Sequence, residues 1–208
     1  MSNRARIEPA VPFRFGGHDA LDFVNTVDSW MRPFERDYIE TFEQLVAWSR
    51  QVGLIEAAKA RSLLGTTPRF AAVAHREALA LRDLLLRIFG AVIDDDTPRR
   101  SDMLTLNRLL AEARRQQVLT PSAGKFGWTW AGEVDPRTPT LLIALAAADL
   151  LERIDLTRLK RCPGPDGCGW LFIDVSRNRS RRWCSMDYCG SFAKARRFAK
   201  AHRGWREG

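Results

Sequence analysis

Residues 162–168 read Cys-Pro-Gly-Pro-Asp-Gly-Cys, and residues 184–189 read Cys-Ser-Met-Asp-Tyr-Cys. These two segments hold all the cysteines of the chain, Cys162, Cys168, Cys184 and Cys189. The first segment must turn, because its prolines and glycines cannot continue a helix or a strand. Structural zinc is bound by four ligands that usually come as two close pairs on turns. The spacing therefore predicts one structural zinc ion held by four thiolates, with no open position for water or substrate.

The residues between and after the cysteine pairs complete a small predicted module. Residues 170–173, Trp-Leu-Phe-Ile, and residues 181–183, Arg-Arg-Trp, are interpreted as two short strands joined by a polar turn at 174–180. A helix is expected after Cys189. A tail of this size has little apolar surface, so a metal that contributes folding energy accounts for its stability. Buried free thiols and two disulfides are the alternatives, and disulfides require an oxidising compartment.

The net charge of +8 is concentrated in the same part of the chain. Residues 158–208 hold 13 Lys and Arg against 4 Asp and Glu, net +9, whereas residues 1–157 are net −1. Two domains are therefore expected, a helical one at 1–157 and a basic zinc module at 158–208, with a packed joint near 156–160. Neither a run of ~20 apolar residues nor a secretory signal is found, so we expect a cytoplasmic protein without a membrane partner.

Helix signals dominate the first 157 residues. The pairs Thr67-Pro68, Thr97-Pro98 and Thr138-Pro139 each precede an apolar stripe and are interpreted as helix starts, with threonine as the N-cap. The third stripe, 141–154, is apolar almost all round, which predicts a central buried helix. Residues 41–44, Thr-Phe-Glu-Gln, form a capping box before a helix that stops at Gly53.

A short β element interrupts these helices. Residues 118–133 contain aromatic residues at every second position, at 126, 128 and 130, which predicts a hairpin. The predicted fold class is mainly α: a multihelical amino-terminal domain with a small β-hairpin, followed by a zinc-bound β-hairpin and helix.

Several stretches resemble a known family. Residues 168–174 (Cys-Gly-Trp-Leu-Phe-Ile-Asp), 176–186 (Ser-Arg-Asn-Arg-Ser-Arg-Arg-Trp-Cys-Ser-Met) and 189–190 (Cys-Gly) are similar to the CGNR zinc finger of bacterial proteins. Residues 15–27, which begin Phe-Gly-Gly-His-Asp-Ala-Leu-Asp, resemble the opening motif of the ABATE domain that precedes that finger. The resemblance implies a zinc-containing regulator of transcription that responds to stress. The chain departs from the motif that names the finger, because Ser191 and Phe192 replace its Asn-Arg.

The last helix predicts a binding surface by itself. At about 100° per residue, basic side chains fall on one half of its surface, and Phe192, Phe198 and His202 fall on the other half, which could dock on the zinc hairpin. Arginine and lysine match phosphate oxygens. The predicted nucleic-acid contacts are Arg177, Arg179, Arg181, Arg182, Lys194, Arg196, Arg197, Lys200 and Arg203. A solvated basic face, or internal pairs with acidic groups such as Asp174 and Asp187, is the alternative.

The polar residues near the amino terminus allow a second hypothesis. His18, Asp22 and Asn25 could place polar groups in a ligand pocket, although a glycine turn followed by an ordinary capped helix explains the same residues. Three histidines without a recognisable nucleophile, and the absence of catalytic motifs, argue against an enzyme.

These observations predict a zinc-containing, nucleic-acid-binding regulator, with DNA favoured over RNA. The alternative is a protein-interaction or RNA-binding zinc module attached to a ligand-sensing helical domain. A homodimer and a small-molecule effector are further hypotheses.

Overall fold

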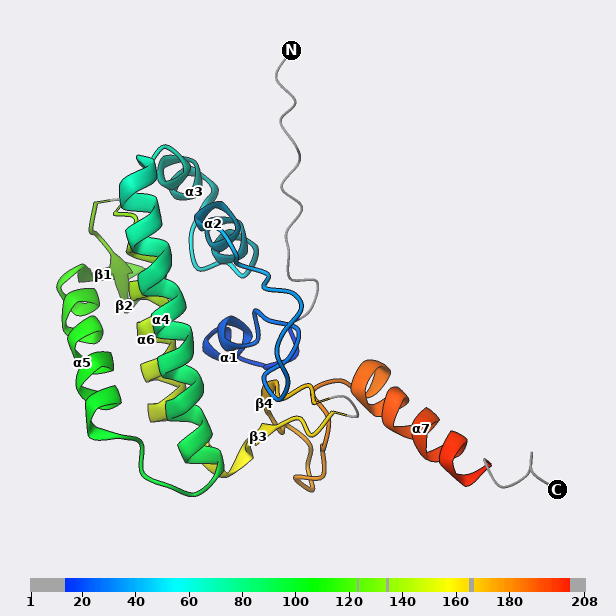
Figure 1. Cartoon of the computed structure of the whole chain (residues 1–208). Helices are drawn as coiled ribbons and strands as arrows, with labels where there is room; N and C mark the ends of the chain where they lie inside the picture. Colours follow the sequence, from blue (N-terminus) through cyan, green and yellow to red (C-terminus); the bar gives the residue numbers. More distant parts are fainter. Residues whose placement is uncertain (1–13, 123, 134, 165–166, 203–208) are drawn as a thin grey trace, which may run out of the picture.

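The long helix α4 (Pro68–Ile93) forms the spine of the helical body (Figure 1). The computed structural model describes residues 14–122, 124–133, 135–164 and 167–202. Around α4 pack α1 (Asp19–Val24), α2 (Phe42–Gln51), α5 (Arg100–Arg115) and α6 (Thr138–Arg153). A further helix, α3 (Ala57–Leu64), packs against α2. The body is thus the mainly helical domain that the sequence predicts.

The apolar stripe of α4 explains its central position. Leu81, Leu85, Ile88 and Phe89 recur at helical spacing and are at most 2% exposed. They belong to one continuous core to which α1, α2 and α6 also contribute. The predicted central helix α6 buries eight of its sixteen residues, most of them in its first ten positions, whereas its last turn is partly exposed.

The observed helix starts lie within a few residues of the predicted ones, but most of the predicted capping residues do not form the capping hydrogen bond. Thr41 and Gln44 form the predicted capping box at the start of α2, and Gly53 follows that helix with a φ of +81°. Thr67 is the N-cap of α4, but its hydroxyl caps no backbone N–H. The other two N-caps were placed wrongly, because α5 is capped by Arg99 and α6 by Arg137. The starts of α4 and α6 could still be located, because each has a proline in its first turn. Proline is tolerated there since the first N–H groups of a helix have no partner within the helix.

The predicted hairpin between α5 and α6 is confirmed. Strand β1 (Gln117–Ser122) pairs antiparallel with β2 (Lys125–Trp130), with Leu119 opposite Trp128. Nearly all of β2 is exposed, because the hairpin stands at the edge of the helical body (Figure 1).

The second hairpin differs from the prediction. Strand β4 (Leu171–Ile173) pairs with β3 (Leu159–Arg161), which follows the short 3-10 helix η1 (Leu156–Arg158). Residues 181–183 form no strand. The residues predicted as a joint therefore overlap with the first strand of the finger. Their position follows from packing, because β3 contacts α4 and β4 contacts α1.

The last helix, α7 (Ser191–Ala201), leaves the rest of the molecule as a projecting arm (Figure 1). The expectation that its apolar half docks on the zinc hairpin was wrong, since α7 contains no buried residue and Phe198 is 66% exposed. The apolar side chains of the hairpin are already covered by the helical body. Leu171, Phe172 and Ile173 are at most 5% exposed, and their buried neighbours belong to the body and the cysteine-bearing turns.

Candidate zinc centre and nucleic-acid interface

The four cysteine sulfurs are arranged to hold one metal ion. Their Sγ atoms all lie within 4.8 Å of one another. The Sγ of Cys184 lies 3.7 Å from those of Cys168 and Cys189. A tetrahedron with zinc about 2.3 Å from each thiolate has edges of about 3.8 Å, so the donor set fits zinc in both chemistry and size. The four cysteines form a site for one structural zinc ion.

The backbone of the first cysteine pair is held as a tight turn. The N–H of Cys162 donates to the carbonyl of Trp170 at 2.8 Å, and the N–H of Gly169 donates to the carbonyl of Cys162 at 3.1 Å. Gly169 has a φ of +71°, and a Cβ there would lie 2.9 Å from the side chain of Trp30. Glycine is therefore required both for the turn and for the close approach of the helical body.

The second cysteine pair lies at the base of the arm. Cys189 belongs to the single-turn π-helix η2 (Met186–Gly190), which continues directly into α7. The side chain of Ser185 caps this turn by accepting a hydrogen bond from the N–H of Tyr188. Because η2 is the element in contact with α7, the zinc centre fixes the point from which the arm leaves.

A loop of the helical body is bonded to the first cysteine turn. The N–H of Trp30 donates to the carbonyl of Cys168 at 2.9 Å, and the indole N–H of Trp170 donates to the carbonyl of Val27 at 2.7 Å. The loop is held in place by Arg82 of α4, which is 4% exposed and pairs with Asp37 through two hydrogen bonds. The zinc centre is therefore built on the body and not attached through a free linker.

The residues predicted to form a ligand pocket lie in structural contacts. Asn25 is 2% exposed; its side-chain amide donates to the carbonyl of Leu171 at 2.8 Å and accepts from the N–H of Leu171 at 2.9 Å. Asn25 thus pairs with β4 as a neighbouring strand would. Asp22 accepts from the N–H of Gly16 at 2.8 Å, and burial raises its pKa. The side chain of His18 caps α1. A ligand at these residues stays a prediction.

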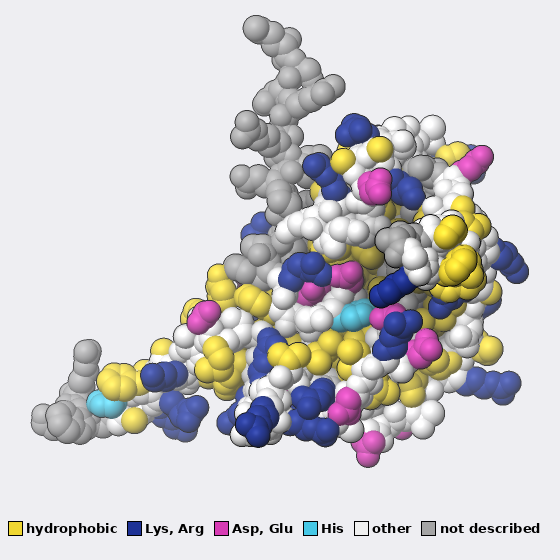
Figure 2. Space-filling model, turned by 180° about the vertical axis from the view of Figure 1, so that it is seen from behind, with side chains coloured by type: hydrophobic (Ala, Val, Ile, Leu, Met, Phe, Trp, Pro, Cys, Tyr) yellow, Lys and Arg dark blue, Asp and Glu magenta, His cyan; other side chains and the backbone are white. Residues whose placement is uncertain are grey.

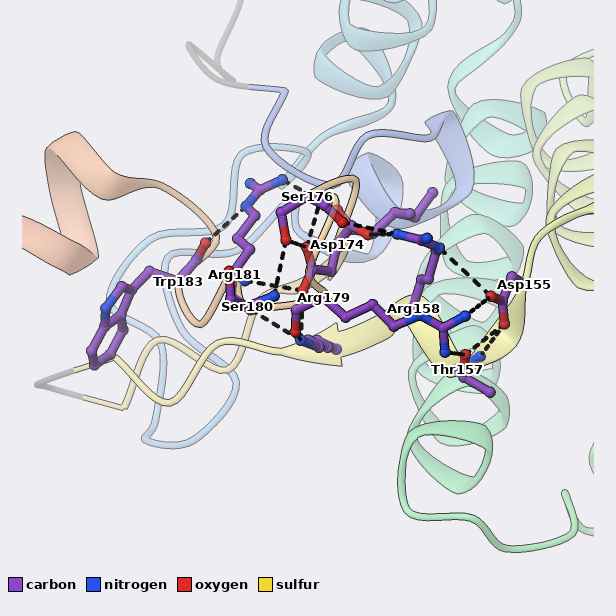
Figure 3. A network of polar contacts seen from close by, with 11 residues as sticks. Asp155, Thr157, Arg158, Asp174, Ser176, Arg179, Ser180, Arg181 and Trp183 are labelled. Atoms are coloured by element: carbon purple, nitrogen blue, oxygen red, sulfur yellow. Dashed lines mark hydrogen bonds and ion pairs between the residues drawn. The ribbon is translucent and has the colours of Figure 1, made fainter.

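Two of the predicted nucleic-acid contacts take part in an internal network (Figure 3). Arg179 pairs with Asp155 at 2.9 Å and donates to Thr157. Arg181 donates to the carbonyls of Ile173, Phe15, Trp183 and Cys184. The Arg179 guanidinium therefore links the 174–180 turn to residues 155–157, and the Arg181 guanidinium stabilises the segment that carries Cys184.

The centre of this network is Asp174, which is fully buried. It accepts hydrogen bonds from the ammonium group of Lys160 at 2.6 Å and from the N–H of Arg181 at 3.0 Å. Burial raises the pKa of Asp174, but hydrogen bonds from Lys160 and Ser176 outweigh burial and hold the pKa well below its ordinary value. The aspartate is therefore a charged structural group, as the internal-pair alternative anticipated.

The other predicted contacts point to solvent. Arg177 and Arg182 are exposed in the cysteine-bearing part, and Lys194, Arg196, Arg197 and Lys200 are exposed on α7. Arg203 lies outside the described residues. We call residues 159–190 the finger root and α7 the arm. The root uses most of its basic side chains internally, whereas the arm presents its basic side chains outward.

Sequence reasoning missed a cavity beside the zinc centre. It has a volume of about 240 Å³ and lies where residues 28–38 of the body meet the finger root and the start of the arm. Its walls come from segments far apart in the chain, so no local pattern could have indicated it.

The fold and this site define a class: a mainly helical protein with a four-cysteine zinc finger at its carboxy-terminal side. Residues 17–153 match the ABATE family, described as "putative stress-induced transcription regulator", and residues 158–202 match the CGNR zinc finger. The chain belongs to the ABATE family, and its finger is of the CGNR type. No curated protein matches the chain. None of the helices in the described residues is long and apolar enough to cross a membrane.

Proposed function

We propose that this protein binds duplex DNA through its arm and regulates transcription by doing so. The description of the ABATE family and the zinc finger support a regulator. A non-catalytic role is part of the proposal, because four thiolates complete the coordination of zinc and leave no position for a substrate.

The observation that carries this proposal is the charge of the arm. Its sequence, Ser-Phe-Ala-Lys-Ala-Arg-Arg-Phe-Ala-Lys-Ala, contains four basic residues and no acidic residue. Within the described part of the chain, Lys194, Arg197 and Lys200 form no ion pair with Asp or Glu. Figure 2 shows dark blue side chains beside hydrophobic ones along this projection. Such side chains can neutralise phosphates and release counterions.

The shape of the arm favours duplex DNA over duplex RNA. Its eleven residues span about 16 Å, and a helix about 10–12 Å in diameter enters a major groove about 12 Å wide. The major groove of duplex RNA is deep and narrow and does not admit a helix. The arm projects away from the other helices and strands of the described chain, and its four basic residues are exposed (Figure 1).

A protein partner is the second candidate, and a specific observation favours it. Phe192 and Phe198 are 60% and 66% exposed on the half of the arm opposite to the basic residues. Exposed aromatic side chains are enriched at protein interfaces. The same arm could contact DNA with one half and a protein with the other. Substitutions of the basic residues and of the aromatic residues therefore distinguish the two functions.

The test is DNA binding by the zinc-loaded protein across a range of salt concentrations. We expect binding at low salt. A triple variant, Lys194→Ala, Arg197→Ala, Lys200→Ala, should make the negative slope of log K against log salt shallower by about 2.7, at ~0.9 per lost phosphate contact. The matched control replaces three exposed arginines of the body, Arg61→Ala, Arg69→Ala and Arg76→Ala, and should keep the slope of the unaltered protein. Absence of binding at low salt, or an equal effect of both triple variants, would contradict the proposal.

A further inference from the structure

The cavity beside the zinc centre has walls of aromatic side chains. Phe15, Tyr38, Trp170, Tyr188 and Phe192 contribute rings to it. The rings of Phe15 and Tyr188 lie 5.7 Å apart, and those of Phe15 and Trp170 lie 6.2 Å apart. With a volume of about 240 Å³, the cavity is smaller than the roughly 300 Å³ at which sites for drug-sized ligands begin. It therefore suits a molecule of one or two rings.

Three of the polar side chains that line the cavity, those of Arg32, Asp28 and Ser29, are bonded to other protein groups. Arg32 pairs with Asp28 at 3.1 Å, and the hydroxyl of Ser29 donates to the carbonyl of Gly167 at 2.5 Å. A charged ligand would have to break the ion pair of Arg32 to find a partner in it. The lining thus favours an apolar, uncharged molecule.

Three of the four zinc ligands also form part of the wall. Cys168, Cys184 and Cys189 line the cavity, whereas Cys162 is fully buried and does not. Cys168 and Cys189 are half-buried, whereas Cys184 is 2% exposed, so Cys168 and Cys189 are the more accessible of the three. A cysteine that coordinates zinc is a thiolate, and the thiolate is the nucleophilic form of cysteine. Nucleophilic sulfur and an apolar binding space are therefore side by side.

We propose that this cavity binds small apolar electrophiles of the α,β-unsaturated carbonyl class and directs them to Cys168 or Cys189. In the reaction, a lone pair of the sulfur forms a bond to the β-carbon, and the π electrons move to the carbonyl oxygen. A proton from water then completes the α-carbon. Nothing is oxidised or reduced, and the cysteine becomes an uncharged thioether. The zinc site loses a thiolate ligand, so zinc is released from the base of the arm. The inference depends on the zinc centre and not on DNA binding.

Phe192 is a wall residue of the cavity at which this chain departs from the motif that names the finger. It stands where the motif that names the finger has arginine, and its ring lines the cavity at the first turn of the arm. An arginine at this place would add a charge to the apolar wall. Phe198, on the same helix and similarly exposed, does not line the cavity and is the matched control.

The test compares two uncharged maleimides that react by the same addition, N-phenylmaleimide and N-(2-hydroxyethyl)maleimide. Each is added to the zinc-loaded protein, zinc release is followed with a chromogenic chelator, and the adduct is located by mass spectrometry. Rates are divided by those with glutathione. We expect a preference for the phenyl compound of about tenfold or more, equivalent to about 1.4 kcal/mol of apolar contact. The first adduct should lie on Cys168 or Cys189, with one zinc released per adduct.

Variants decide whether the cavity causes this preference. Phe192→Ala and Phe192→Arg should each reduce it several-fold while zinc content stays at one per chain, and Phe198→Ala should leave it unchanged. Three results would overturn the proposal: no preference beyond that of glutathione, a first adduct on Cys162, or an equal effect of Phe192→Ala and Phe198→Ala.

Discussion

The finger root and the arm are neighbours in the chain with opposite relations to the body. In the root, Leu171 and Phe172 are completely buried, and Arg179 and Arg181 are bonded to protein groups. In the arm no residue is buried, and Lys194, Arg197 and Lys200 have no ion-pair partner among the described residues. The difference teaches that net charge alone does not locate a binding surface. Only basic groups that the fold does not use remain available for a partner.

The comparison predicts that the zinc centre supports the body as well as the finger. Cys184→Ser should abolish zinc binding and lower the free energy of unfolding by more than about 4 kcal/mol, because loss of a metal site is among the largest single-residue effects. Thermal unfolding with measurement of zinc content checks this. Since β4 contributes to the main core, the melting temperature of the helical body should fall too. Removal of zinc from the unaltered protein by a chelator should give the same melting curve. A body that melts unchanged would show that the root is independent of it.

A second prediction concerns the link between the body and the root. Asn25→Ala leaves the N–H and carbonyl of Leu171 buried without partners and should cost about 2–5 kcal/mol of stability. Denaturant unfolding measures this loss. Asn178→Ala, at an exposed position of the 174–180 turn, is the control and should change stability by less than about 0.5 kcal/mol. Equal losses of stability in the two variants would contradict the assignment of Asn25 as a link between the body and the root.

Arg181 and Arg182 are neighbours within the root, and we expect their removal to change stability by different amounts. Arg181→Ala should cost about 2–3 kcal/mol of stability, because it removes charged donors from the carbonyls of Ile173, Phe15 and Cys184. Arg182 is exposed and contacts the ring of Trp183, so Arg182→Ala should leave stability within about 1 kcal/mol. If Arg182 contacts phosphate, its removal should lower the salt slope of DNA binding by about 0.9. Unfolding and binding measurements on both variants check the pair, and a reversed pattern would contradict the assignment.

The sequence contained enough information for the zinc ligands and the main helices. Cysteine spacing is a local pattern that turns impose, and the apolar stripe of α4 follows from helix periodicity. Strand β3 could not be predicted, because it is three residues long and two of them are basic. Its strand conformation comes from pairing with β4 and from packing on α4.

Side-chain roles that depend on distant partners were also beyond local patterns. The polar residues around Asn25 allow a ligand pocket, but the sequence does not show that the side chain of Asn25 bonds to Leu171, 146 positions away. Arg177 and Arg179 looked equivalent in the turn, but only Arg179 reaches Asp155. The exposed position of α7 could not be predicted from the sequence. Amphipathicity shows that a helix has an apolar half, but it does not show what covers that half.

Amide hydrogen exchange of the zinc-loaded protein, with and without duplex DNA at low salt, tests the central claim most directly. A helix without buried residues opens at low free energy, so the amides of α7 should exchange quickly in the free protein, while those of β4 should be strongly protected. DNA should slow exchange in α7 by about tenfold or more and leave β4 unchanged. Slowing confined to the root or to the helical body, with α7 unaffected, would contradict the account.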